Sequence, residues 1–269
     1  MRVPPSLAAP EGAFTVPLRV RSYEVGDTGT VGLGTLLRYL ELVATDHSAS
    51  LGFDNRWYER NGTAWFVRAM DIWLGALPGM NVDLLVSTWV ADFRRVQARR
   101  EYAIIRADGG ALVARASGRW GYVDRATGHP RRLEEDLASA FVVYPERTLP
   151  PVYTPFAEPP TASATMSLTA RGYEAVTQGH VNNTVYADWL MEGMRRLARE
   201  HPEEQALRAM VPRRYLIEYV RPVRVGDAVT IATAAIPLSS RRLAVAQSVT
   251  SAADGALCLK AFATYLRTR

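Results

Sequence analysis

An internal repeat is the feature of this chain that most limits what it can fold into. The peptide RSYEV at residues 21–25 is matched by RGYEA at residues 171–175, and both lead through a polar, glycine-containing stretch into a helical pattern. Further matches follow in the same order: residues 78–83 with 222–227, 94–96 with 241–243, and 108–123 with 254–266. Matches that keep their order indicate two copies of one supersecondary unit.

Each copy combines one amphipathic helix with strand-like segments. In the first copy, apolar residues recur at three- and four-residue spacing and predict a helix with one apolar face: Leu33, Leu36, Leu37, Leu40, Val43 and Ala44. The second copy has the same pattern at Val185, Trp189, Leu190 and Met194. Downstream, segments such as DLLVSTWVADF and REYAIIRA predict antiparallel strands, with an Asp-Gly turn in both halves. A long helix needs an apolar surface to cover, so we expect each sheet to wrap around its helix, which is the α+β hotdog arrangement.

A proline-rich stretch separates the two copies. Residues 144–165, YPERTLPPVYTPFAEPPTASAT, contain six prolines and show no apolar periodicity, which predicts an extended linker over the surface. The predicted organisation is an N-terminal hotdog domain at residues 1–143, the linker at 144–165 and a C-terminal hotdog domain at 166–269. The predicted fold is therefore a tandem, or double, hotdog.

Composition excludes several classes of protein. The chain has 269 residues, of which 48% are hydrophobic and 22% charged, as in a folded globular protein. No apolar run reaches the roughly 18 residues of a membrane span, and the first residues lack the pattern of a signal peptide, so we expect a cytoplasmic protein. The net charge of +5 is accompanied by no nucleic-acid-binding motif, so no nucleic-acid partner is expected. The single cysteine, Cys258, lies between leucines and is expected to be a small core residue.

The motifs of several enzyme classes are absent from the sequence. There is no Gly-x-Ser-x-Gly elbow, no P-loop, no dinucleotide fingerprint and no His/Cys cluster with zinc spacing. The sequence therefore lacks the motifs expected of a serine hydrolase, a kinase, a dehydrogenase or a structural zinc protein. No cofactor and no metal site are expected.

One motif in the second copy does indicate a function. The segment TQGHVNNTVYADWLMEG places His180, Asn182 and Asn183 at the expected start of the helix. The chain resembles the acyl-acyl carrier protein (acyl-ACP) thioesterases of plants and bacteria, a double-hotdog family. The resemblance rests on this motif and on three segments of the first copy: LLRYLELVATDHSASLG, GTAWFVRAMDIWL and STWVADFRRVQARREYAI. The resemblance spans nearly the whole chain. It implies hydrolysis of a fatty acyl thioester to a free fatty acid, with acyl-ACP or an acyl-coenzyme A (acyl-CoA) ester as the partner.

Thioester hydrolysis needs an activated water, and hydrogen-bond donors for the negative charge that develops on the carbonyl oxygen. His180 is expected to polarise or deprotonate water near neutral pH, and Gln178 to orient that water. Asn182 is a candidate for the same catalytic site. The backbone N–H groups of the first helical turn, beginning near Val181 and including Asn183, are expected to face the thioester carbonyl. Structural alternatives stay open: His180 as a buried residue that shapes the turn, and the two asparagines as helix caps.

The sequence also departs from the family pattern. Where the family usually has Asp-x-Asn-x-His, this chain has Val176, Gln178 and His180, so the aspartate is missing and glutamine replaces asparagine. After LIEYV, where the family usually has an acid or a cysteine, residues 221–223 are Arg-Pro-Val. A catalytic carboxylate would then come from elsewhere. Three glutamates are candidates, each with a structural alternative: Glu174, Glu192 and Glu218.

The first copy offers further candidates. Asp27 precedes the first helix and could face a thioester, although an aspartate in a glycine-containing stretch commonly stabilises its own turn. Asp46 and His47 are adjacent at the end of that helix, where a histidine also complements the helix dipole. Two tryptophans of this copy, Trp65 and Trp73, are candidates for lining an acyl channel, with a plain core as the alternative.

Three hypotheses for the function follow. The leading one is an acyl-ACP thioesterase, the nearest alternative is an acyl-CoA thioesterase of the same fold, and the third is a non-catalytic acyl-thioester-binding protein that has lost the base. The replacements at Val176 and Pro222 favour the third. A double hotdog contains its own internal pseudo-dimer, so a monomer is compatible with the fold, and a homodimer formed through the sheets is the expected assembly.

Overall fold

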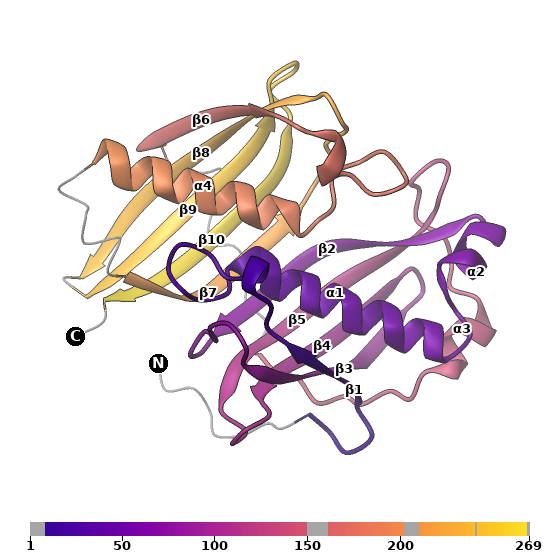
Figure 1. The fold of residues 1–269 in the computed structure, drawn as a ribbon. Coiled ribbons are helices and arrows are strands. Elements are labelled where there is room, and N and C mark those ends of the chain that lie inside the picture. The colour runs from indigo at the N-terminus through magenta and orange to yellow at the C-terminus, as the bar shows by residue number, and fades with distance from the viewer. Residues whose placement is uncertain (1–8, 150–160, 202–209, 240, 268–269) are drawn as a thin grey trace. The chain divides into compact units, whose positions relative to one another are not determined.

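The computed structural model describes residues 9–149, 161–201, 210–239 and 241–267. The chain divides into two compact units, Met1–Pro151 and Val152–Arg269. In Figure 1 each unit shows one long helix lying across its own sheet, α1 in the first and α4 in the second. The predicted α+β tandem hotdog is confirmed.

The first unit contains five antiparallel strands in the order β1-β3-β4-β5-β2. The strands are β1 (Phe14–Arg19), β2 (Thr63–Leu74), β3 (Asp83–Arg94), β4 (Gln97–Arg106) and β5 (Leu112–Asp124). The helices are the 3₁₀ helix η1 (Ser22–Glu24), the long α1 (Leu33–Ser50), and the short α2 (Asn55–Arg60) and α3 (Glu135–Ala140).

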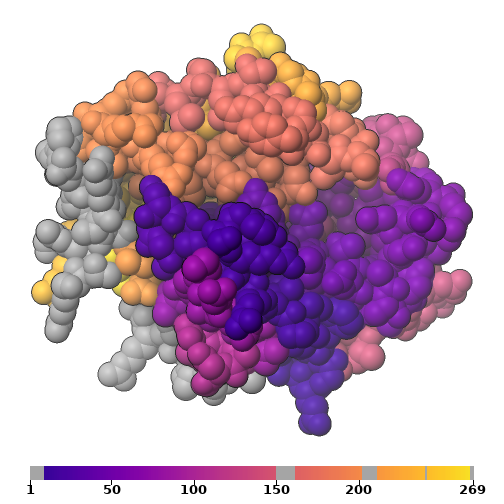
Figure 2. All heavy atoms as spheres, viewed as in Figure 1, coloured from indigo at the N-terminus to yellow at the C-terminus, as the bar shows by residue number. Residues whose placement is uncertain are grey.

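The second unit repeats this arrangement with the strand order β7-β10-β9-β8-β6. The strands are β6 (Ala164–Thr169), β7 (Met210–Tyr219), β8 (Ala228–Ser239), β9 (Arg242–Ser251) and β10 (Leu257–Arg267). The 3₁₀ helix η2 (Gly172–Glu174) precedes the long helix α4 (Val185–Glu200). In Figure 2 the side chains of β6 and α4 cover much of this face of the second unit.

The apolar stripes predicted for the two long helices form the centre of each core. Leu36 and Val43 of α1 are fully buried, and so is Leu190 of α4. Burial of one such side chain stabilises the fold by about 1.5–3 kcal/mol, which fixes the face that each helix presents to its sheet. Gly193 brings α4 especially close to its sheet, since a Cβ atom there would lie 2.8 Å from the hydroxyl of Thr233.

A polar contact made by a glutamate is repeated in both units. The Glu24 carboxylate accepts hydrogen bonds from the backbone N–H of Arg21 (2.7 Å) and the hydroxyl of Tyr39 on α1 (2.8 Å). In the second unit Glu174 accepts from the backbone N–H three residues earlier (2.7 Å) and from the indole of Trp189 on α4 (3.1 Å). Each glutamate therefore ties its 3₁₀ helix to the long helix of its own unit.

The stretch expected to be a linker, residues 144–165, lies partly outside the described residues, because 150–160 are not described. Its first residues are packed onto the first unit: the buried Thr148 donates its N–H (2.9 Å) and its hydroxyl (2.6 Å) to the carboxylate of Glu101. Glu101 is fully buried and needs such donors. At the other end, β6 already begins at Ala164. The described ends of this stretch thus belong to the two units.

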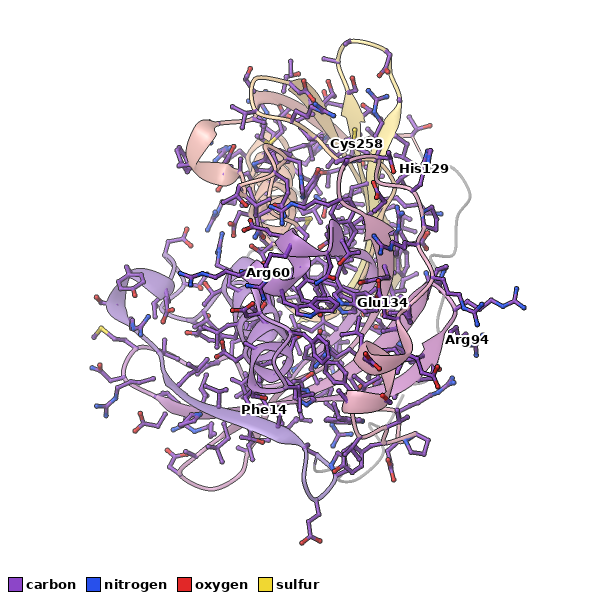
Figure 3. The ribbon with its side chains drawn as sticks, turned by 90° about the vertical axis from the view of Figure 1, so that its right-hand side faces the viewer. Phe14, Arg60, Arg94, His129, Glu134 and Cys258 are labelled. Carbon is purple, nitrogen blue, oxygen red and sulfur yellow. The ribbon has the colours of Figure 1, made fainter. Side chains whose placement is uncertain are left out.

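Among the described residues, no helix is long and apolar enough to cross a membrane. Cys258 lies on β10 (Figure 3) and is only 2% exposed. Burial raises the pKa of its thiol. A buried protonated thiol is a poor nucleophile, so this cysteine is a core residue.

Candidate active site

A tight polar loop precedes α4 and carries the histidine motif. The N–H of Val176 donates to the carbonyl of His180 (2.9 Å), and the N–H of Gly179 donates back to the carbonyl of Val176 (2.9 Å). Gly179 has a φ of +76°, a conformation that favours glycine. Ala175 and Val181 form an isolated bridge that closes the loop at its base. The Gln-Gly-His sequence thus places Gln178 at the exposed tip and returns the chain at His180.

His180 is half-buried and is held through its backbone by an antiparallel bridge to Arg224. Burial lowers the pKa of its imidazole, and the positive charge of Arg224 lowers that pKa further. Both effects favour the neutral ring at neutral pH. A neutral imidazole can accept a proton, so His180 is suited to act as a general base.

The helix begins later than the sequence predicts. His180, Asn182 and Asn183 were expected at its start, but α4 begins at Val185 and its N-cap is Thr184. The Asn182 side chain bends the chain ahead of the helix, because its Oδ1 accepts from the N–H (2.8 Å) and the hydroxyl (2.7 Å) of Thr184. This oxygen has a structural task of the Asx-turn kind. Because the side-chain oxygen of Asn182 is already bonded to Thr184, it does not support the expected catalytic role of this residue.

The backbone donors expected near Val181 are mostly occupied. The N–H of Val181 donates to the carbonyl of Val223 (2.8 Å), and the N–H of Asn182 donates to the carbonyl of Glu174 (2.9 Å). The N–H of Val181, expected to face the substrate, is therefore already bonded within the protein. Among the described residues, no protein acceptor is in place for the N–H of Asn183. Asn183 is thus the candidate donor to a thioester carbonyl.

Two tyrosines that sequence reasoning missed hold this segment in place. The hydroxyl of Tyr219 on β7 donates to the carbonyl of Asn183 (3.0 Å). The hydroxyl of Tyr186 on α4 accepts from the N–H of Val223 (2.9 Å). Tyr186 and Tyr219 both lie in segments singled out from the sequence, but nothing in their local spacing indicates contacts between the start of α4 and the end of β7.

The three glutamates considered as replacement bases all have structural partners. Glu174 is buried and binds Trp189 as described above. Glu192 forms an ion pair with Arg195 one turn along the exposed side of α4. Glu218 lies 3.3 Å from the ammonium group of Lys260 on the neighbouring strand. In the described part of the chain, no group of three metal-ligating residues is present either.

The two tryptophans expected to line one acyl channel lie on opposite faces of the first sheet. Trp65 is paired with Tyr122, and its indole N–H donates to the hydroxyl of Tyr58 (3.1 Å). A register shift between Val67 and Ala69 reverses the alternation along β2, as a β-bulge does. Trp73 is consequently paired with Arg115, on the face away from α1. Only Trp65 stays a candidate for a channel next to α1.

Comparison with known proteins finds similarity to thioesterases in both units. Residues 11–141 match the family model of the acyl-ACP thioesterase N-terminal domain, and residues 177–266 match that of the thioesterase-like superfamily. The first unit thus matches the acyl-ACP thioesterase family, and the second matches the broader thioesterase-like superfamily. Among curated members of the acyl-ACP thioesterase family, the chain is 25% identical to oleoyl-acyl carrier protein thioesterase 1 of Arabidopsis thaliana over 65% of this chain and 53% of the relative. It is 26% identical to a palmitoyl-acyl carrier protein thioesterase of Cuphea hookeriana, over 66% of this chain and 46% of the relative.

The chain thus spans about half the length of the curated acyl-ACP thioesterases it matches. Solved structures share its fold over nearly the whole chain. The 12:0-ACP thioesterase from Umbellularia californica has a TM-score of 0.82 at 17% identity, covering 95% of this chain and 94% of that one. An acyl-ACP thioesterase from Bacteroides thetaiotaomicron has a TM-score of 0.75 at 20% identity, covering 93% and 96%.

Proposed function

We propose that this protein hydrolyses fatty acyl-ACP thioesters to free fatty acids, with its reacting groups on the loop before α4. The observation that carries the proposal is the half-buried His180 on that loop, whose pKa is lowered by burial and by Arg224, in a chain whose first unit matches the acyl-ACP thioesterase family. We also propose a role in fatty acid biosynthesis and a cytoplasmic location. The proposed assembly is a homodimer, which sedimentation equilibrium tests.

In the proposed reaction His180 removes a proton from a water molecule, and the water oxygen attacks the thioester carbonyl carbon. The backbone N–H of Asn183 donates to the oxygen that becomes negatively charged. The carbon–sulfur bond then breaks, and the protonated His180 returns its proton to the departing thiolate. The products are the fatty acid and the free thiol of the carrier. Gln178, at the exposed tip of the loop, is the group proposed to orient the water.

Thiol release from acyl-ACP and acyl-CoA esters of graded chain length tests this proposal. Wild type is expected to release thiol, and His180→Ala to lose at least about a hundredfold in kcat/KM, since a positioned acid–base group typically contributes that much. Thr30→Ala is the matched control, because Thr30 occupies the corresponding position before α1. Equal rates for His180→Ala and wild type would remove His180 from the mechanism.

The carrier is tested in the same assay. An acidic carrier protein should depend on surface arginines and on ionic strength more than coenzyme A does. A kcat/KM that is higher for acyl-ACP, and falls with added salt, supports ACP as the carrier. A higher, salt-independent value for acyl-CoA would support the acyl-CoA thioesterase instead.

A second function is favoured by the missing acids. Val176 stands where the family usually has an aspartate, and Pro222 lies where it usually has an acid or a cysteine. The three candidate glutamates are engaged elsewhere. A protein that binds acyl thioesters without hydrolysing them would fit these replacements. Tight acyl-thioester binding by wild type without thiol release would support that function and contradict hydrolysis.

A further inference from the structure

A buried arginine in the first unit has no acidic partner. Arg100 on β4 is 8% exposed and its side chain faces α1, where Nη1 donates to Nδ1 of His47 at 3.0 Å. Its other hydrogen bond, also from Nη1, is a long one of 3.5 Å to the hydroxyl of Thr88. Within the described ranges, Nε and Nη2 have no acceptor and no carboxylate pairs with this guanidinium. These donors are available to a ligand.

A cation in this position is costly to the fold. Burial lowers the pKa of Arg100, yet an arginine stays protonated in proteins and cannot avoid the cost by releasing its proton. His47 cannot balance this charge, since an imidazole is either neutral or positively charged, and burial and Arg100 lower its pKa to about 4. Removing a charge from water without a counterion is strongly unfavourable, and a bound anion would compensate it.

The second unit fills the same place without any charge. The register of the strand pairs in the two sheets equates Tyr102 on β4 with Gln247 on β9. Arg100 and Val245, each two residues earlier and on the helix-facing side, are therefore equivalent. Val245 is 1% exposed.

The helix repeat completes this comparison. Tyr39 and Trp189 bind equivalent glutamates, and eight positions further along each helix are His47 and Leu197. Leu197 is fully buried. The hotdog fold thus packs two aliphatic side chains where the first unit has a histidine and an arginine, so the charged pair is not a requirement of the fold.

Aromatic rings surround the charged pair. Phe14 on β1 (Figure 3) stacks on His47 with ring centroids 5.0 Å apart, and Phe141 meets His47 edge-on at 5.1 Å. The guanidinium carbon of Arg100 lies 5.5 Å from the centre of the Phe141 ring. Phe141 also belongs to a cluster that includes Tyr58 and Leu137. Such apolar walls disfavour a hydrated inorganic anion and suit a carboxylate attached to a hydrocarbon chain.

We propose that Arg100 and His47 form a binding site for the carboxylate of an aliphatic chain. Nε and Nη2 of Arg100 donate to the two carboxylate oxygens, and the aromatic rings pack on the chain. The carboxylate comes from a free fatty acid, or from an acyl thioester whose far end is a carboxylate. The site involves no bond breaking, so a direct binding measurement tests it independently of the proposed hydrolysis.

Calorimetric titration of the full chain with dodecanoate tests the site. Arg100→Met is expected to weaken binding by at least about tenfold, because it removes charge-assisted hydrogen bonds. Arg115→Met is the matched control: Arg115 is 4% exposed on the opposite face of the same sheet, and its loss should leave binding unchanged. The neutral methyl dodecanoate should bind wild type and Arg100→Met equally.

Two further measurements test whether the charged pair binds the carboxylate and where that carboxylate comes from. The double variant His47→Leu/Arg100→Val copies the aliphatic pair of the second unit, so it should stay folded by circular dichroism and not bind dodecanoate. Dodecanedioyl-CoA and dodecanoyl-CoA separate the two sources, since an Arg100-dependent preference for dodecanedioyl-CoA assigns the site to a chain-end carboxylate. Binding of dodecanoate and dodecanedioyl-CoA that is absent, or equal in wild type and Arg100→Met, would overturn the proposal.

Discussion

The loops that precede the two long helices have the same backbone and different chemistry. In the first, the N–H of Gly26 donates to the carbonyl of Thr30 (3.1 Å) and Gly29 has a φ of +74°. In the second, the equivalent bond runs from Val176 to His180 (2.9 Å), with a φ of +76° at Gly179. One loop geometry therefore presents a threonine in one unit and an imidazole in the other. The repeat thus preserves the backbone of the loop, while single side chains distinguish the candidate site from its counterpart.

The value of kcat/KM should depend strongly on pH. A base with a pKa below 6.5 keeps its proton-accepting form at neutral pH, so kcat/KM should be constant there and fall about tenfold per pH unit below the pKa of His180. The midpoint of the pH–rate profile should therefore lie below pH 6.5. Arg224→Ala should move that midpoint upward, because it removes a charge that lowers the pKa. A midpoint at or above pH 6.5 in wild type would contradict this account of the loop.

The two glutamate contacts should matter to stability in both units. Glu174→Gln and Glu24→Gln each weaken hydrogen bonds to a carboxylate and should lower the free energy of unfolding by about 1–3 kcal/mol, measured by urea denaturation. The loss should be larger for Glu174, which is 6% exposed, than for the half-buried Glu24. If Glu174→Gln left stability unchanged while it abolished thiol release, Glu174 would be a catalytic group and not a structural one.

Substitution of the equivalent loop glycines should lower stability slightly in both units and activity in only one. Gly29→Ala and Gly179→Ala should each cost about 1–2 kcal/mol of stability, because both residues have positive φ and no neighbouring atom within 4 Å adds a clash. The two variants should therefore melt alike. Only Gly179→Ala should lower kcat/KM, since it alone disturbs the return of the chain to His180. Equal losses of activity in the two variants would break the proposed difference between the loops.

The fold could be predicted from the sequence because its signals are local and occur twice. Apolar spacing in residues 33–44 and 185–194 predicts both long helices, and the order of the matches predicts the repeat. The start of α4 could not be predicted, because the side chain of Asn182 binds Thr184 outside the helix. A polar residue near a helix start does not reveal whether it caps the helix or bends the chain before it.

The remaining differences come from contacts that local sequence does not encode. Trp65 and Trp73 are an even number of positions apart and would share a face of a regular strand, but the register shift in β2 separates them. Arg100 and His47 meet across a strand and a helix that are far apart in the chain. From the sequence, His47 is a candidate beside Asp46 or a residue that complements the helix dipole, and neither interpretation includes Arg100. Such pairings become visible once the topology is known.

Reactivity is proposed to lie in the loop before α4, and His180→Thr tests this because it copies the residue of the loop before α1. The measurement is kcat/KM for a fatty acyl-ACP, with circular dichroism to verify folding. We predict a loss of at least about a hundredfold with the fold intact. Undiminished hydrolysis by folded His180→Thr would contradict the claim.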